Sequence, residues 1–418
     1  MIAIRYLWYY FFWLIVRLGL SFYFKKIKIS GLGNIPKGRP VIFAANHENA
    51  FMDALLVTTR VGRFTHYLVR ADVFKNPLAS AILKSFNMLP VFRIRDGFGS
   101  LKANAKSFAQ CIDALARGRS LLMFPEGKHD IRRVKRKLTK GISRIALGAI
   151  NSEHGMKELY VVPVGLCYSD HKAFRSSVHV VFGDPIEVHG QQDAESQKTL
   201  RNQINDGLIH CTIALEEKSY KELDTLIFKS ESGYDLSAPT QINTHAEKLA
   251  KCLKQTEGDG LNLAVDEFNE SMESLGAKAW NPVKSMNRAK SLVVLITLLP
   301  FYLYGIAHNF IPIVISESII ALKVKDKIFT SSIKFALGLF LFPFCWLLEW
   351  QFFFPLQENP FYSVVYVMTL PASLLLVSHY HMELGKFWAR RKLDKDSELR
   401  SNLEKSLSYL QRFKDKCH

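Results

Sequence analysis

The stretch PVIFAANHENAFMDALL places a histidine and an aspartate, His47 and Asp53, where an apolar strand gives way to an amphipathic helix. On one continuous helix a separation of six would put them on different faces, but a turn between strand and helix lets them meet. A carboxylate that accepts the Nδ1 proton of an imidazole fixes its tautomer and leaves Nε2 to take a proton from an alcohol. No serine nucleophile is evident, so the alcohol would belong to a substrate. Taken alone, a histidine and an aspartate at this spacing are explained better by a surface histidine near a helix start than by a catalytic pair.

Basic residues form two further candidate groups. In LPVFRIR, Arg93 and Arg95 stand two apart on an expected strand, so they project to one face and would clamp a phosphate, or would be two solvated edge charges. The buried strand of LLMFPEGKHD runs into Glu126 and Gly127, and Lys128 begins a basic run. Seven basic residues occur within thirteen positions: Lys128, Arg132, Arg133, Lys135, Arg136, Lys137 and Lys140. Such a run is usually a solvated face or a nucleic-acid patch, and it also suits a phosphate-rich headgroup or a phosphopantetheine-bearing donor.

The elements that must position these residues lie in the region 30–228. Short β-branched runs (VIFAAN, LLMFPEG, VVPVGLCY, VHVVFGDPIEV) alternate with helix-period stretches. This alternation predicts an α/β fold with a mostly parallel sheet flanked by helices. One expected helix carries a core stripe at Leu200, Ile204, Leu208, Cys211 and Leu215. In VVPVG, Val162 and Pro163 belong to an apolar strand and by themselves indicate nothing further.

Composition narrows the class of protein. The 418 residues are 48% hydrophobic, which excludes a disordered chain, and the formal net charge of +17 implies an anionic partner such as nucleic acid, a membrane surface or a phosphorylated substrate. The apolar excess is concentrated in blocks of bilayer length, which favours a membrane. Six cysteines stand far apart without metal-ligand spacing, so we expect reduced thiols and no metal.

The first apolar block predicts an N-terminal membrane anchor over residues 1–29. Nineteen residues from Tyr6 to Phe24 contain Arg17 as their sole charge and are rich in Trp and Tyr. An in-plane or re-entrant anchor and a true span are equal alternatives, and a buried soluble helix is disfavoured by the lysines that follow. A polar helical connector is expected at 229–290.

The C-terminal third predicts a membrane region at 291–385 and a basic cytosolic tail helix at 386–418. Segments 334–354 and 361–380 are expected to form a transmembrane hairpin, since basic residues flank it and the link PLQENP has none. The segment 291–322 must then leave the membrane on the same side from which it enters. We expect a re-entrant or in-plane helix pair there, broken near Pro300 and Pro312. The catalytic region would face the cytosol.

Taken in order, NHENAFMD, PVFRIR, FPEG and VPVG resemble the four motif blocks of the phospholipid/glycerol acyltransferase family. The similarity covers about residues 30 to 190, and FPEGKHD with the later VVPVGLCY and FGDPI resembles most the glycerol-3-phosphate and dihydroxyacetone-phosphate branch. The resemblance implies that His47, oriented by Asp53, is the general base. It implies acceptor contacts at Arg93, Glu126 and Gly127, to which we add Arg95 and Lys128. Val162 and Pro163 correspond to the block near the acyl donor.

The resemblance implies a membrane-bound O-acyltransferase of phospholipid biosynthesis that needs no cofactor. The donor would be an acyl-coenzyme A or acyl carrier protein thioester, and the acceptor glycerol-3-phosphate or dihydroxyacetone phosphate. The alternative acceptor is 1-acyl-sn-glycerol-3-phosphate, which yields phosphatidic acid. The alternative from another class is a non-catalytic membrane protein that binds anionic lipid. Partners would be membrane lipids, the donor and the acceptor, and no nucleic acid.

Overall fold

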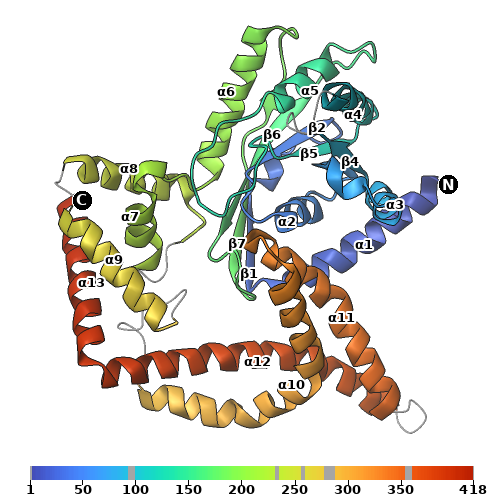
Figure 1. Ribbon diagram of the computed structural model, residues 1–418. Coiled ribbons are helices and arrows are strands. Elements are labelled where there is room, and N and C mark those ends of the chain that lie inside the picture. Colours follow the sequence, from blue (N-terminus) through green and yellow to red (C-terminus); the bar gives the residue numbers. More distant parts are fainter. Residues whose placement is uncertain are drawn as a thin grey trace. The chain divides into compact units, whose positions relative to one another are not determined.

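The computed structural model describes residues 2–92, 99–230, 235–255, 259–276, 288–353 and 360–417 (Figure 1). The chain forms two compact units, each described here by itself. The first comprises Met1–Ala214 with Leu236–Thr240, and the second comprises Leu215–Asp235 with Gln241–His418. The five-part division expected from the sequence stays a prediction.

An eight-stranded mixed sheet organises the first unit, with strand order β1-β7-β6-β2-β5-β3-β4 and β8 paired to β6. The strands are β1 (Lys26–Ser30), β2 (Val41–Ala45), β3 (Thr65–Arg70), β4 (Met88–Val91), β5 (Ser120–Met123), β6 (Tyr160–Tyr168), β7 (Ser177–Phe182) and β8 (Ile186–Glu187). Only the pairs of β6 with β7 and with β8 are antiparallel among the described pairs. The predicted mostly parallel sheet flanked by helices is confirmed.

Helices cover the sheet, which explains why its central strand VIFAA is buried throughout. The helices are α1 (Ile2–Tyr23), α2 (Phe51–Val61), α3 (Pro77–Ser85), α4 (Gly99–Ala116), α5 (Gly141–Ile150) and α6 (Ala194–Cys211). Short 3₁₀ turns occupy Leu32–Asn34 and Ala71–Phe74. On one face, α4, α5 and α6 share a core with Ile42 and Ala44 of β2 and Leu121 of β5. Leu200, Ile204 and Leu208 of the expected stripe are buried in this core, whereas Cys211 is buried outside it and Leu215 lies beyond the end of α6.

The second unit contains a small helical bundle and three long apolar helices. Its elements are a 3₁₀ turn (Glu217–Ser219), α7 (Tyr220–Asp224), a π-helical turn (Thr225–Lys229), α8 (Pro239–Gln255), α9 (Asp259–Ser274), α10 (Arg288–Lys323), a 3₁₀ turn (Lys327–Phe329), α11 (Thr330–Phe353), α12 (Pro360–Lys395) and α13 (Ser397–Cys417). In the bundle, α9 packs against α13, and Val265 and Phe268 of α9 and Leu403 and Leu410 of α13 are buried.

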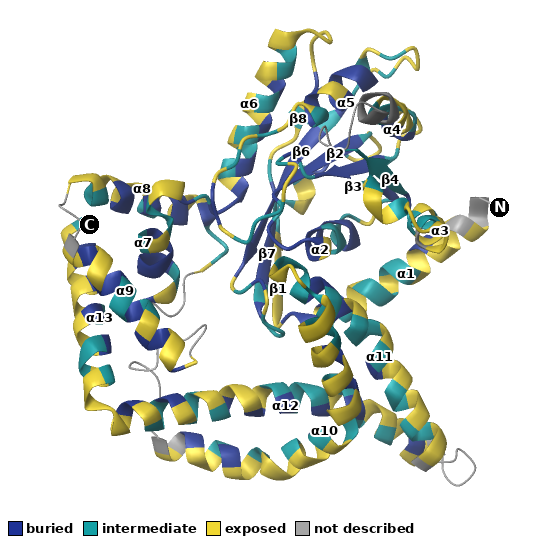
Figure 2. Cartoon of the chain, viewed as in Figure 1, coloured by how far each residue is buried: buried dark blue, intermediate teal, exposed yellow. Residues whose placement is uncertain are grey.

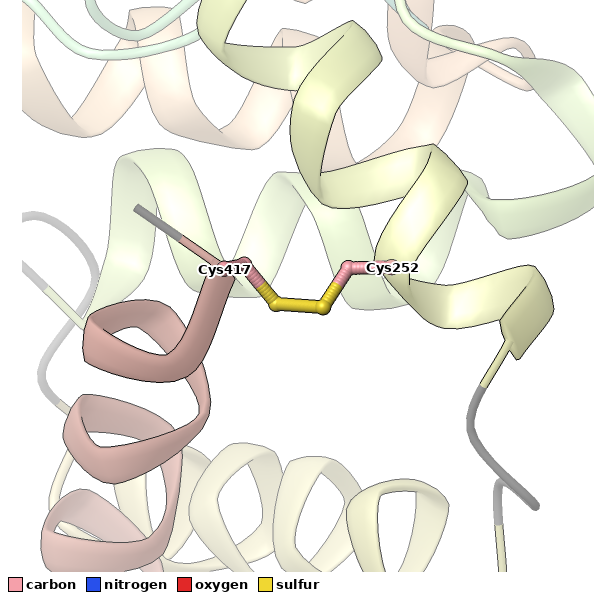
Figure 3. Close-up of a disulfide and its surroundings, with 2 residues drawn as sticks. All are labelled: Cys252 and Cys417. Atoms are coloured by element: carbon pink, nitrogen blue, oxygen red, sulfur yellow. A yellow bond between two sulfur atoms is a disulfide. The ribbon is translucent and has the colours of Figure 1, made fainter.

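A disulfide joins Cys252 of α8 to Cys417 of α13, with a Cα–Cα distance of 5.9 Å (Figure 3). The expectation that all six cysteines are reduced was therefore wrong. The two residues are 165 positions apart, and no local spacing could pair them. The packing of α13 along the bundle brings them together. The other four cysteines are unpaired.

Among its described residues, the second unit has three helices long and apolar enough to cross a membrane: Ser291–Lys323, Lys327–Phe352 and Phe361–Lys395. Figure 2 shows long exposed stretches along α10, α11 and α12, and many of the exposed side chains are large and apolar. These include Val293, Ile296, Phe301, Phe310, Phe340, Phe344, Leu347, Phe361, Val364 and Met368. Surfaces of this kind are compatible with lipid.

The expected break near Pro300 and Pro312 was wrong, because α10 is one continuous helix of 36 residues. A proline removes one backbone donor and bends a helix, but neighbouring groups can satisfy the carbonyl that it leaves. Between the two prolines, Asn309 Nδ2 donates to the carbonyl oxygen of Gly305 at 2.8 Å. The helix runs through both prolines.

Candidate active site

The central strand β2 delivers His47 to the carboxyl edge of the parallel sheet, where its neighbours β5 and β6 also end. Asn46 extends the pairing beyond β2: its Oδ1 accepts from the Leu166 N–H at 2.8 Å and its Nδ2 donates to the Leu166 carbonyl at 3.1 Å. At Ala50 the backbone adopts φ 45°, a left-handed value that is strained for a non-glycine residue. This turn starts α2 and brings Asp53 back toward His47.

The structure brings the predicted pair together. His47 Nδ1 lies 2.8 Å from Asp53 Oδ2, and the same carboxylate oxygen accepts from the Asn49 N–H at 2.8 Å. Asp53 is fully buried, whereas the His47 side chain is 18% exposed. With Nδ1 held by the carboxylate, Nε2 is the nitrogen left to exchange a proton with a bound molecule.

The His47 ring rests on the turn that follows β5. It stacks on Phe124 at a centroid distance of 3.9 Å, with the ring of His129 at 5.5 Å. Gly127 in this turn has φ 68°, and a Cβ there would lie 2.9 Å from Thr139 Cγ2. Only glycine meets both conditions without strain, because its backbone reaches positive φ and carries no side chain.

Glu126 forms an ion pair with Arg136, whose guanidinium also donates to the carbonyl of His47 at 3.3 Å and to that of Asp130 at 2.8 Å. Burial raises the pKa of Glu126, and the charge of Arg136 offsets only part of that effect. Arg136 thus ties the FPEG turn to the histidine turn. The Asp130 N–H also donates to the His47 carbonyl, at 3.1 Å.

A second buried histidine–carboxylate pair lies beside the first. His171 Nε2 is 2.8 Å from Glu48 Oε2, and Glu48 Oε1 accepts from Asn46 Nδ2 at 3.1 Å. Burial raises the pKa of Glu48 to about 8, against the opposing charge of Arg133. Asn49 Nδ2 donates to the His171 carbonyl at 2.9 Å, so both sides of the histidine turn are anchored.

The sequence of the region that contains this site also matches a known protein family. Residues 26–167 match the family model described as Acyltransferase. The first unit carries an acyltransferase domain. This agrees with the resemblance of the four motif blocks.

Similar curated proteins match this chain over short stretches. Glycerol-3-phosphate O-acyltransferase 2 of Saccharomyces cerevisiae is 34% identical over 88 residues, which are 21% of this chain and 12% of that protein. The chloroplastic 1-acyl-sn-glycerol-3-phosphate acyltransferase LPAT1 of Arabidopsis thaliana is 26% identical over 105 residues, covering 25% and 28%. The matched stretches span less than a third of either relative.

A solved structure, the 1-acyl-sn-glycerophosphate (LPA) acyltransferase PlsC of Thermotoga maritima, aligns with a TM-score of 0.36 at 20% identity. The alignment covers 46% of this chain and 76% of that one.

The other predicted site residues of the acyltransferase domain fall into three groups. Lys128 is exposed directly after the FPEG turn. Val162 and Pro163 lie inside the sheet, paired with Phe43 and Ala44 of β2, so their side chains pack in the interior. Arg93 and Arg95 lie outside the described residues, two and four positions beyond the end of β4.

The residues of the basic run differ in their contacts: its arginines are held by neighbouring groups, and its lysines are exposed. Arg133 is buried and donates to the Tyr168 carbonyl at 2.9 Å, while Arg136 is held by Glu126. Arg132 lies against Asp130. The exposed lysines of the run are Lys128, Lys135, Lys137 and Lys140. Two of the seven basic residues therefore build the domain, and the exposed lysines are the ones that can meet an anion.

Residues that sequence reasoning did not single out complete the site: Asn49, Glu48, His171, Phe124 and Tyr168. Glu48 and Asn49 stand within the NHENAFMD block, and Phe124 opens FPEG, so their positions carried a signal. His171 and Tyr168 are more than 110 positions from Asp53 and had none. Within the described residues, no three His, Cys, Asp or Glu side chains come together to hold a metal ion.

Proposed function

We propose that this protein transfers an acyl chain from a thioester to a hydroxyl of glycerol-3-phosphate. The observation that carries the proposal is the His47–Asp53 contact of 2.8 Å, with the aspartate fully buried beside the FPEG turn. His47 Nε2 takes the hydroxyl proton as the oxygen attacks the thioester carbonyl. A C–O bond forms, the C–S bond breaks, and the imidazolium returns the proton to the departing thiolate. No covalent acyl-enzyme is needed.

The acceptor phosphate would be met by positive charge at the same edge of the sheet. Lys128 is exposed beside Gly127, and we assign it to the phosphate together with Arg93 and Arg95. Glu126 acts in this scheme by keeping Arg136 in place and so fixing the turn. Val162 and Pro163 would serve the donor through the strand that they build. The donor itself is an acyl-coenzyme A or acyl carrier protein thioester.

The names of the similar proteins mention two different acceptors. The yeast relative is named for glycerol-3-phosphate and the plant relative for 1-acyl-sn-glycerol-3-phosphate. The yeast match has the higher identity, 34% against 26%, and it supports glycerol-3-phosphate as the acceptor. Both acceptors present a hydroxyl near a phosphate, so one base and one set of cations would serve either.

The N-terminal helix α1 has the form of an in-plane membrane anchor. Trp13 Nε1 donates to the Thr58 carbonyl of α2 at 3.2 Å, and Tyr9 OH donates to the Arg63 carbonyl at 3.2 Å. The opposite side exposes an apolar stripe at helical spacing: Ile4, Leu7, Phe11, Leu14 and Leu18. A helix bound to its domain on one side and apolar on the other suits the membrane surface.

Contacts within the second unit constrain how its apolar helices cross. The α9–α13 packing, the disulfide and a hydrogen bond from Lys392 Nζ to the Ser274 carbonyl at 2.8 Å hold both ends of the membrane region together. Three single crossings would separate those ends. These contacts support an even number of crossings between α9 and α13.

The contacts of α10 with α12 and α11 suggest how an even number of membrane crossings would arise. Its first part lies along α12, with Tyr302 stacked on Tyr380 at 4.1 Å, and its last part lies along α11, with Glu317 bound to Lys334 at 2.7 Å. A straight helix of 36 residues is about 54 Å long, far more than a bilayer core of about 30 Å. We propose that α10, a continuous helix, is bent around its prolines so that both its ends face the same side of the membrane, the cytosolic one.

The function is tested by a thiol-release assay of the purified full chain. Acyl-coenzyme A and acyl carrier protein thioesters are each offered with glycerol-3-phosphate, dihydroxyacetone phosphate and 1-acyl-sn-glycerol-3-phosphate. His47→Ala should lower acyl transfer by a factor of about 1,000 or more, since it removes the base, and leave expression and membrane association intact. His154→Ala, at an exposed histidine, is the matched control.

Near-normal turnover by His47→Ala would defeat the proposal. Release of thiol only with 1-acyl-sn-glycerol-3-phosphate would reassign the acceptor and keep the mechanism. Binding of anionic lipid without acceptor-dependent thiol release would establish the non-catalytic alternative.

A further inference from the structure

Tyr168 ends strand β6 at the same sheet edge as the histidine turn, and its side chain is fully buried. Its ring lies 5.0 Å from that of His171 and 6.2 Å from that of Phe24. Its carbonyl accepts a hydrogen bond from Arg133 at 2.9 Å. The backbone and the ring of Tyr168 are thus held in place by contacts that do not involve the hydroxyl.

The hydroxyl of Tyr168 donates to Asp53 Oδ1 at 2.6 Å. The other carboxylate oxygen faces His47 Nδ1 and also accepts from the Asn49 N–H. Three donors therefore surround the buried carboxylate, and a bond of this length to a charged acceptor belongs to the strong, charge-assisted class. With Oδ1 held by the phenol, the carboxylate cannot rotate away from the imidazole without breaking that bond.

The phenol remains a donor over the pH range of an enzyme assay. Burial, and next the negative charge of Asp53, raise the pKa of Tyr168 well above its ordinary value. The hydroxyl therefore keeps its proton and withdraws part of the charge on the carboxylate. Less charge then remains to stabilise a protonated His47.

We propose that Tyr168 is a positioning residue for the His47–Asp53 pair: it fixes the carboxylate and sets how strongly that carboxylate holds a proton on the imidazole. This inference rests on the proposed function, because it assigns a role in the same proton transfer. It also gives the strand that carries the VPVG block a direct connection to the reaction centre.

Tyr168→Phe removes the hydroxyl and keeps the ring. The carboxylate oxygen that faced the phenol then has one donor fewer, and the carboxylate presents more charge to His47 Nδ1. We expect the acid limb of the kcat/KM profile to move up by about half to one pH unit, and kcat to fall about 10-fold with KM unchanged. The other titratable or charged groups around the pair are Glu48, Glu126, His129, His171, Arg133 and Arg136, and the substitution changes none of them.

The matched control is Tyr160→Phe, at the other end of the same strand, where the hydroxyl faces Glu158 and not the site. A second substitution of Tyr168 by monofluorinated tyrosine preserves the fold and strengthens the donor. It should move the acid limb in the opposite direction, to lower pH. The two opposite shifts separate this role from a merely structural one.

Several outcomes would overturn the inference. A fall in activity at all pH values alike, with no displacement of the limb in either variant, would show that Tyr168 only supports the fold. Wild-type profiles in both variants would show that the hydroxyl does nothing. The proposed function fails independently, through a fully active His47→Ala, so the two failures are distinguishable.

Discussion

At the scale of single residues, the site depends on buried polar groups that satisfy one another. Asp53 faces His47, Asn49 and Tyr168, while Glu48 faces His171 and Asn46. Groups of this kind are costly to bury unless each finds a partner. Their mutual contacts therefore fix the histidine turn in one arrangement, and burial raises the pKa of Glu48 among them to about 8.

Glu48→Gln should change how stability depends on pH. Burial raises the pKa of Glu48 from 4.5 to about 8, so folding takes up a proton between these values. The stabilisation from this group is complete below about pH 4.5 and is lost as the pH rises through about 8. Glutamine has no such dependence, so the unfolding temperature of the variant relative to wild type should rise by a few degrees between about pH 5 and about pH 8.

The measurement is thermal unfolding of the full chain in detergent at a series of pH values. Glu153→Gln, at an exposed glutamate, is the control and should track wild type throughout. If the plots of unfolding temperature against pH were parallel for Glu48→Gln and wild type, this would contradict the raised pKa of Glu48.

At the scale of elements, strand β6 connects the core to the site. It pairs with β2 in parallel along five positions, and its last residue, Tyr168, reaches Asp53. Its other side lies against the end of α6, where Gly165 leaves no room for a side chain. A Cβ on Gly165 would lie 1.9 Å from the Cys211 carbonyl oxygen.

Gly165→Ala should therefore destabilise the fold severely, because the obstacle is backbone and not the end of a flexible side chain. We expect the unfolding temperature to fall by at least about 5 °C, or the protein to be lost on expression. Gly33→Ala is the matched control, since no atom lies within 4 Å of the added carbon. Equal unfolding temperatures for the two variants would contradict the close approach of β6 and α6.

At the scale of the whole molecule, each unit has its own relation to a membrane. The first unit exposes the apolar stripe of α1, and the second contains three apolar helices whose flanking bundle is closed by a disulfide. The net charge of +17 agrees with attachment to an anionic surface. Within the second unit, the proposal of an even number of crossings rests on contacts and not on composition.

The proposed course of α10 is tested with two single cysteines in a chain whose Cys345 is replaced by serine. Lys325→Cys lies between α10 and α11, and Lys405→Cys lies on α13, both at exposed positions. An impermeant maleimide applied to sealed vesicles should label both from the same side, because α10 returns to the face where it began. Labelling from opposite sides would show that α10 crosses once and that α11 and α12 together form the return.

The sequence by itself determined the local features: the alternating strands and helices, the apolar helices, and the turn that lets His47 meet Asp53. These follow from hydrophobic periodicity and from residue types within a few positions of one another. The tertiary structure alone decided that Tyr168 holds Asp53, that Arg136 joins two motif blocks, that Cys252 bonds Cys417 and that α10 continues through its prolines. Each of these depends on partners brought close by packing, and such contacts leave no periodic trace in the chain.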